Sequence, residues 1–307
     1  MRVLITGHSG FIGQHIVARL SGKHDLFLLN SDLRDHAAVH DEILAADPEV
    51  IVHLAARTEV EKSFYEQTVF SEINYVGTVN LIEASSKLSN LKNFVFASTM
   101  EVYGWQPISD LIRDGNESEI EVFDETTIPN PNAPYSVAKF ACEKYLEYAS
   151  RSYNFPYTII RQTNAYGRKD NDFFVTEQII TQMLKNPNEI NLGYGVPYRN
   201  FLYIDDLIDA WETVIDNPDK CVGQLVCLGP NNAIRISDYV AMIAKKLNWE
   251  GKVNWNTKPA RPGEIYLLNS SNAKLTNMTG WEPKVELSEG LDRTIAFWKE
   301  KLNEVQN

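Results

Sequence analysis

The sequence is poor in basic residues for its length. Lysine and arginine together number 29 in 307 residues, against 41 aspartates and glutamates, so the formal net charge is −12. Nucleic acids and anionic membranes both require a basic protein surface, and this charge argues against either as a partner. A local group of arginines could still bind a small anionic substrate.

Cysteine is also scarce, and long apolar runs are missing. Cys142, Cys221 and Cys227 are an odd number of cysteines without paired spacing. We therefore expect no disulfide framework and no metal site, and a reducing compartment such as the cytoplasm. No apolar run is long enough to span a membrane, and the N-terminus enters a predicted strand without the pattern of a signal peptide.

Short apolar segments alternate with helical patterns along the chain. This alternation predicts an α/β fold, a doubly wound parallel sheet with a smaller C-terminal lobe. We expect residues 1–165 and about 198–229 to form a cofactor-binding domain, and about 166–197 and 230–307 to form a substrate-binding lobe. The predicted strands are 2–6, 26–29, 50–54, 93–97, 157–160 and 225–228.

A glycine turn follows the first predicted strand. Gly7, Gly10 and Gly13 have the spacing GxxGxxG, with Phe11 and Ile12 between the last two, and an amphipathic stretch comes next. Strand, glycine turn and helix open a dinucleotide-binding unit, in which backbone N–H groups approach a pyrophosphate. We expect Leu54, Ala55 and Ala56, after the third strand, to lie close to the same cofactor.

The end of the second strand leaves the choice between NAD and NADP open. An acidic residue there would bind the ribose hydroxyls of NAD, and a basic residue would favour NADP. Asn30 is neither, and Arg34 is either a partner for a 2′-phosphate or an ordinary exposed arginine. Asp32 and Leu33 either contact the adenine edge or form a turn.

Tyr135 and Lys139 lie four residues apart on a predicted helix and therefore project from one face. A lysine ammonium beside a phenol lowers the pKa of the phenol, which can then take a proton from an alcohol near neutral pH. The alternative is an ordinary exposed pair. Thr99 ends the fourth predicted strand, where a hydroxyl faces the ligand crevice of a parallel sheet.

A long acidic segment separates Trp105 from Asn132. It carries Asp110, Asp114, Glu117, Glu119 and Glu121 and is predicted to be a solvated surface loop or a lid.

Taken together, the motifs resemble those of the extended short-chain dehydrogenase/reductase family, in its nucleotide-sugar epimerase/dehydratase branch. The resemblance covers nearly the whole chain and implies a Rossmann domain that binds NAD or NADP. It also implies a homodimer formed through helices near 65–87 and 135–153. The matching motifs, in family order, are GxxGFIG (7–13), NxxGT (74–78), STxxVYG (98–104), YxxxK (135–139), RxxNxYG (161–167) and RNFLYIDD (199–206).

The same resemblance implies a mechanism on a nucleoside-diphosphate sugar. Tyr135 would take a proton from the sugar C4 hydroxyl, with Lys139 on the nicotinamide ribose and Thr99 on the same oxygen, while hydride leaves C4 and a 4-keto sugar forms. The residues that would hold the nucleotide and its diphosphate are Asn164, Arg199 and Arg261, of which the arginines bind phosphate oxygens bidentately. The other residues expected to bind the substrate are Thr99, Met100, Glu101 and Glu264.

The residues after Thr99 decide the fate of the keto sugar. Related 4,6-dehydratases have Asp-Glu there, an acid that protonates the leaving hydroxyl and a base that removes the C5 proton. Here the pair is Met100-Glu101. Methionine cannot donate that proton, and Glu101 is either a base or a structural carboxylate. We therefore rank C4 epimerisation first, NADPH-dependent reduction of a 4-keto-6-deoxy sugar second and 4,6-dehydration third. A non-catalytic cofactor sensor is disfavoured because Tyr135 and Lys139 are both present.

Overall fold

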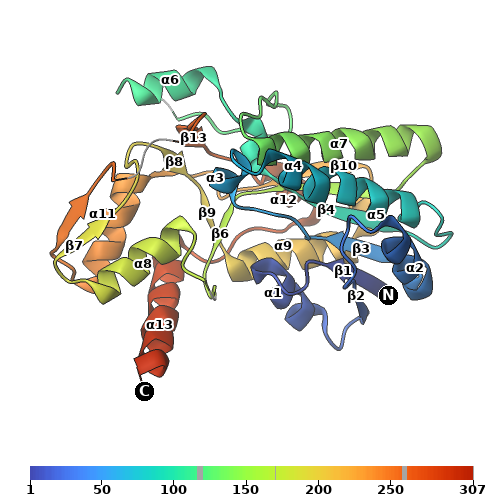
Figure 1. Ribbon diagram of the computed structural model, residues 1–307, viewed down its shortest axis with the longest axis horizontal. Coiled ribbons are helices and arrows are strands. Elements are labelled where there is room, and N and C mark those ends of the chain that lie inside the picture. Colours follow the sequence, from blue (N-terminus) through green and yellow to red (C-terminus); the bar gives the residue numbers. More distant parts are fainter. Residues whose placement is uncertain (116–119, 170, 258–260, 307) are drawn as a thin grey trace.

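A computed structural model describes residues 1–115, 120–169, 171–257 and 261–306. Its centre is a parallel sheet of six strands in the order β10-β5-β4-β3-β1-β2, which confirms the predicted doubly wound fold (Figure 1). The chain leaves β1 towards β2 and then returns to β3 on the other side of β1. Ligands of such sheets bind outside the carboxyl ends of the strands at this point of reversal. The strands are β1 (Arg2–Thr6), β2 (Asp25–Leu28), β3 (Val50–His53), β4 (Asn93–Thr99), β5 (Tyr157–Gln162) and β10 (Gln224–Leu228).

Helices cover both faces of this sheet. Side chains alternate between the faces along each strand, so Val3 and Ile5 pack into one apolar core while Leu4 packs into the other. The first core includes Ile16 of α1 (Phe11–Leu20) and Trp211 of α9 (Ile204–Asp216). The second core is closed by α2 (His36–Ala46), α5 (Gly77–Ser85) and α7 (Pro134–Tyr153).

The predicted helical stretch at 65–87 is divided. It contains α4 (Gln67–Ser71), a π-helical turn η1 (Glu72–Val76) and then α5. A Cβ added at Gly77 would lie 2.7 Å from the Cβ of Leu33, so only glycine lets the helix pack this closely.

A smaller lobe lies at the end of the molecule away from α2 (Figure 1). Its helices are α8 (Val175–Lys185), α11 (Ile236–Leu247) and α13 (Leu287–Gln306). Two short strand pairs and one small sheet accompany them. The pairs are β7 (Glu189–Asn191) with β12 (Lys252–Asn254) and β6 (Asn164–Tyr166) with β9 (Phe201–Tyr203), and the sheet has β8 (Tyr198–Arg199) between β11 (Ile234–Arg235) and β13 (Leu267–Leu268).

The remaining short elements of the chain are α3 (Val60–Ser63), η2 (Met100–Tyr103), α6 (Pro107–Arg113), α10 (Pro218–Cys221) and α12 (Ala273–Thr279).

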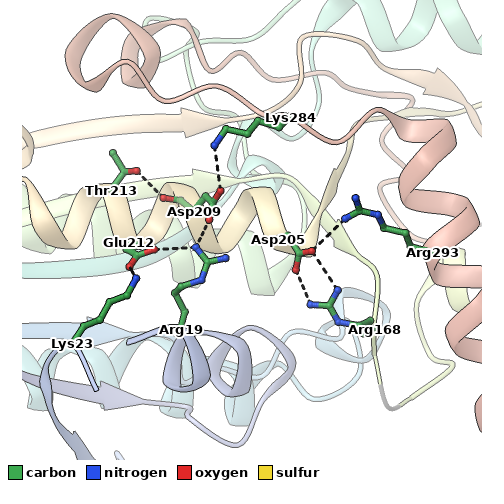
Figure 2. Close-up of polar contacts among 9 residues, drawn as sticks. All are labelled: Arg19, Lys23, Arg168, Asp205, Asp209, Glu212, Thr213, Lys284 and Arg293. Carbon is green, nitrogen blue, oxygen red and sulfur yellow. Dashed lines mark hydrogen bonds and ion pairs between the residues drawn. The ribbon is translucent and has the colours of Figure 1, made fainter. Parts of the chain in front are cut away.

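Ion pairs join α9 to its neighbours on either side (Figure 2). Arg19 of α1 contacts both Asp209 and Glu212. At the start of α9, Asp205 accepts from Arg168 at 2.6 Å and lies 3.6 Å from Arg293 of α13. These side chains are partly exposed, so each pair stabilises the fold by at most about 1 kcal/mol. Of these pairs, the one with Arg293 joins α9 to the smaller lobe.

The acidic segment between Trp105 and Asn132 is not simply a solvated loop, and that alternative was wrong. It contains α6, whose Ile108 and Ile112, one turn apart, are buried, as is Phe123 further on. The part of this segment that the structure describes does not line the large cavity at the carboxyl ends of the central strands. Asp110 and Asp114 pair with Arg113, whereas Glu117 and Glu119 lie outside the described residues. Among the helices that the structure describes, none is long and apolar enough to cross a membrane.

Candidate active site

A cavity of about 850 Å³ opens at the carboxyl ends of β1, β3, β4 and β5, between the sheet and the smaller lobe. A volume of this order is typical of small-molecule and cofactor sites. The structure brings together there all but three of the residues predicted from sequence. Those lining it are Gly7, Gly10, Phe11, Ile12, Gly13, Leu54, Ala55, Ala56, Thr99, Met100, Glu101, Tyr135, Lys139, Asn164, Arg199, Arg261 and Glu264.

The glycine turn forms one wall of the cavity. Gly7 has a φ of 68°, and a Cβ there would lie 2.6 Å from the backbone nitrogen of Ala55. A Cβ at Gly13 would overlap the carbonyl oxygen of Gly7. Helix α1 begins at Phe11 with no side-chain cap, so its first N–H groups remain available to an anion. This cradle fits the pyrophosphate of a dinucleotide.

The three exceptions, Asn30, Asp32 and Leu33, lie beyond the end of β2 and do not line the cavity. Leu33 is buried against Gly77. The carboxylate of Asp32 binds the guanidinium of Arg34, with a shortest contact of 2.6 Å. Contacts of these three residues with a cofactor therefore stay a prediction.

Tyr135 and Lys139 lie in the first turns of α7, where Pro134 begins the helix and the Ser136 hydroxyl donates to Ala133. Both side chains are almost fully buried, so they are not an exposed surface pair. The Lys139 ammonium donates to the carbonyl of Ala97 at 2.8 Å.

The expected lowering of the Tyr135 pKa by Lys139 was wrong for this protein. Burial raises the pKa of Tyr135, and the negative charge of Glu101 adds to that increase, while a hydrogen bond with Thr99 opposes it. Burial also lowers the pKa of Lys139 to about 8. Desolvation is therefore the largest influence on the pKa of both side chains.

Thr99 and Glu101 lie opposite the tyrosine, where β4 passes into η2. The Thr99 hydroxyl oxygen accepts from the backbone N–H of Glu101 at 3.1 Å, and the same hydroxyl shares a hydrogen bond with Tyr135. One carboxylate oxygen of Glu101 is buried without a hydrogen-bond partner among the described residues. Glu101 is thus placed to act on a ligand in the cavity.

Met100 supplies no proton donor beside Thr99. Its side chain is buried, and its sulfur accepts a hydrogen bond from the hydroxyl of Thr163 at 2.8 Å. The position that would need an acid for loss of water is thus occupied by an apolar side chain.

Two arginines converge on one carboxylate across the cavity. Glu264 accepts from Arg199 at 3.3 Å and from Arg261 at 2.9 Å. Burial lowers the pKa of Arg199, an effect opposed by the charges of Glu264 and Glu101. Asn164 donates to the carbonyl of Asn200 at 3.2 Å. The paired guanidinium groups suit a diphosphate, because their planar forks match phosphate oxygens.

Sequence reasoning missed a buried ion pair at the cofactor wall. Lys169 lies 3.9 Å from a carboxylate oxygen of Glu177, and its ammonium faces the rings of Phe11 and Phe174. Neither carboxylate oxygen of Glu177 has a hydrogen-bond partner among the described residues. The only sequence signal was position, since Lys169 lies two residues after the RxxNxYG motif.

A buried polar network around Glu143 of α7 was also not predicted from the sequence. Glu143 of α7 accepts two hydrogen bonds from the guanidinium of Arg161, at 3.0 and 2.7 Å, and one from Ser98 at 2.5 Å. Arg161 and Glu143 are both buried. Ser98 precedes Thr99, so this network ties α7 to the strand end that carries the catalytic threonine.

Comparison with known proteins decides the family. Residues 3–229 match the model of the NAD dependent epimerase/dehydratase family. The chain belongs to this family.

The relatives of this chain include enzymes that are named for different reactions. The putative UDP-glucose 4-epimerase of Methanocaldococcus jannaschii is 28% identical over 97% of this chain and 98% of its own length. The GDP-6-deoxy-D-mannose reductase of Pseudomonas aeruginosa is 25% identical over 99% of both chains. Human and bacterial dTDP-glucose 4,6-dehydratases also match.

A solved structure shares the fold over the full length of the chain. The UDP-glucose 4-epimerase of Thermotoga maritima, solved with UDP-glucose, superposes with a TM-score of 0.86 at 27% identity, covering 98% of this chain and all of that one. Other structural neighbours hold NAD or NADPH. The protein is therefore an NAD(P)-dependent enzyme of the nucleotide-sugar epimerase/dehydratase kind.

Proposed function

We propose that the protein epimerises a nucleoside-diphosphate sugar at C4 through a 4-keto intermediate. The observation that carries this proposal is the triad of Thr99, Tyr135 and Lys139 in one cavity, next to a position, Met100, that has no acid. Such a site can oxidise and reduce C4, but it lacks the proton donor that loss of water requires.

A bound nicotinamide supplies the hydride chemistry at C4. Tyr135 takes the proton of the C4 hydroxyl as hydride leaves the carbon, and returns the proton when hydride comes back. Thr99 donates to the same oxygen and holds it beside the phenol. Lys139 places a positive charge next to this pair, which favours the negative charge that develops on the sugar oxygen.

The nucleotide end of the substrate would lie under the smaller lobe. Arg199 and Arg261 bind the diphosphate, and Glu264 holds the two guanidinium groups in place before the ligand arrives. Asn164 lines the same cavity. A local cationic site of this kind accounts for a nucleotide ligand on a chain whose net charge is −12.

Reduction of a nucleoside-diphosphate 4-keto-6-deoxy sugar is the second candidate. The same tyrosine would then protonate the C4 alkoxide in a single direction. Similarity to a GDP-6-deoxy-D-mannose reductase over nearly the full length favours this alternative. Dehydration ranks third because of Met100.

We also infer that the enzyme works as a homodimer. Exposed apolar side chains gather on η1 and α7, which lie side by side: Val76, Val137, Tyr148 and Tyr153 are 43–51% exposed. Burying such a patch in a second copy is favourable.

A substrate panel tests the proposed reaction. UDP-, dTDP- and GDP-linked hexoses and their 4-keto-6-deoxy derivatives are incubated with NAD⁺ and, separately, with NADPH, and products are identified by mass spectrometry and NMR. An epimerase gives a product of unchanged mass with inverted C4 and no net use of cofactor. Stoichiometric NADPH oxidation with a gain of two hydrogens would establish the reductase instead.

A further inference from the structure

A carboxylate from helix α2 occupies the end of β2. Glu42 accepts from the backbone N–H of Asn30 at 2.9 Å, from the N–H of Ser31 at 3.1 Å and from the Ser31 hydroxyl at 2.6 Å. These contacts span 11 and 12 residues of sequence, so they arise only when α2 folds back on the strand. A negative charge thus lies where the sequence places the neutral side chain of Asn30.

In open α/β folds that bind dinucleotides, the end of the second strand lies at the adenosine end of the bound cofactor. Leu29 donates to the carbonyl of Ile5, which holds the end of β2 beside the strand that leads into the glycine turn. In folds of this kind, the residue at the end of the second strand meets the 2′-hydroxyl of the adenosine ribose. A carboxylate has about four acceptor positions, and Glu42 uses three, so one is free for a ribose hydroxyl.

The charge at this position is negative and is not neutralised by the nearest arginine. Burial opposes ionisation of Glu42, but the hydrogen bonds from Ser31 and Asn30 outweigh it and lower the pKa of the carboxyl group. Arg34 is held by both carboxylate oxygens of Asp32, with Oδ1 at 3.0 Å and Oδ2 at 2.6 Å. A 2′-phosphate would therefore meet the charge of Glu42 without a free guanidinium to bind it.

We propose that Glu42 makes this enzyme selective for NAD over NADP, by accepting from the ribose hydroxyl and repelling a 2′-phosphate. The inference rests on the proposed function, which it deepens by naming the cofactor. It also favours epimerisation over NADPH-dependent reduction, because an epimerase recovers its NAD in every cycle. It needs only dinucleotide binding, so a failure to turn over any sugar would leave it standing.

Calorimetric titration of the purified full-length protein with NAD⁺ and NADP⁺ tests the proposal. The wild type should bind NAD⁺ at least about tenfold more tightly, since two like charges a few ångströms apart repel by more than 1 kcal/mol at a protein surface. Glu42→Gln should bring the two dissociation constants to within about threefold of each other. Asp41→Asn removes the same charge from a side chain that is 88% exposed, and should leave the ratio unchanged.

A second variant separates charge from loop structure. Asp32→Asn releases Arg34 and should tighten NADP⁺ binding several-fold while NAD⁺ binding changes little. If Glu42→Gln weakened both cofactors by the same factor, Glu42 would only hold the loop and the proposal would be wrong. A wild type that binds NADP⁺ as tightly as NAD⁺ would overturn it as well.

Discussion

Tyr135 and Lys139 are buried groups, and burial sets their chemistry. A buried phenol keeps its proton, and a buried ammonium loses its proton more readily than an exposed one. Tyr135 can therefore exchange a proton only together with the groups next to it, namely Thr99 and a bound ligand. The buried position of Tyr135 and Lys139 therefore matters more for the reaction than an acidic phenol would.

Removing the phenolic hydroxyl should abolish turnover and spare binding. Tyr135→Phe is expected to lower kcat by about 10²–10⁴, the usual contribution of a positioned acid-base group, with little change in the dissociation constant of the cofactor. Steady-state kinetics and calorimetry measure the two quantities. Tyr148→Phe, on an exposed part of the same helix, is the control. Turnover like that of the wild type in Tyr135→Phe would sink the mechanism.

The depressed pKa of Lys139 makes stability depend on pH. The folded value is about 8 against an ordinary 10.5, so between these values the unfolded chain binds more protons and stability rises with pH. Relative to Lys139→Met, the wild type should gain roughly 2 kcal/mol of unfolding free energy between pH 7 and pH 9.5. Urea unfolding at both pH values measures this difference, with cofactor content matched.

The exposed Lys144→Met is the matched control for that experiment, because its side chain is 54% exposed. It should show no such pH-dependent difference. An equal stability difference between wild type and Lys139→Met at both pH values would contradict the assigned burial of the ammonium.

Among the elements, α7 depends on the buried group behind it. Glu143, Arg161 and Ser98 connect the helix to β5 and β4, and a buried charge without its partner is strongly unfavourable. The catalytic helix is thus held by polar contacts as well as by its apolar face.

Breaking that contact should cost far more than breaking a surface pair on the same helix. Glu143→Ala leaves Arg161 buried and unpaired, and is expected to lower the unfolding free energy by about 3–5 kcal/mol. Glu147→Ala, which breaks the surface contact with Lys144, should cost less than about 1 kcal/mol. Replacing both Glu143 and Arg161 by apolar residues should recover much of the loss. Equal costs for the two single variants would show that the buried pair stabilises nothing.

Local sequence patterns predicted most elements because each pattern reflects a local cause. Buried strands are apolar runs, and the glycine turn needs residues that permit a positive φ. Helix α6 was missed because it is short and lies in an acidic segment, although two of its isoleucines, one turn apart, are buried. The close contact of Gly77 with Leu33 joins residues far apart in the sequence, so no local pattern could predict it.

For the whole molecule, the exposed apolar surface on η1 and α7 makes assembly testable. Tyr148→Glu places a charge in the inferred interface and should shift the mass measured by light scattering from dimer towards monomer. Val122→Glu, at an exposed apolar residue on the 105–132 segment, should leave the mass unchanged. A monomeric wild type would contradict the inferred assembly.

The site itself could be predicted only where one motif carries both the chemistry and its place in the fold. Thr99, Tyr135, Lys139 and the glycine turn are of this kind. Glu42 and the Lys169–Glu177 pair are not, because their roles arise when separate elements meet. The sequence left the cofactor undecided for this reason, since the charge at the end of β2 comes from another element.

Isotope tracing at C4 probes the proposed reaction at the reacting atom. The nucleotide sugar that is turned over in the panel would be prepared with deuterium at C4, incubated with the enzyme and NAD⁺, and followed by NMR and mass spectrometry. Hydride removal and return at one carbon predicts an epimer that keeps deuterium at C4, with unchanged mass and no net NADH. Loss of water, or a product whose C4 carries hydrogen in place of deuterium, would contradict epimerisation.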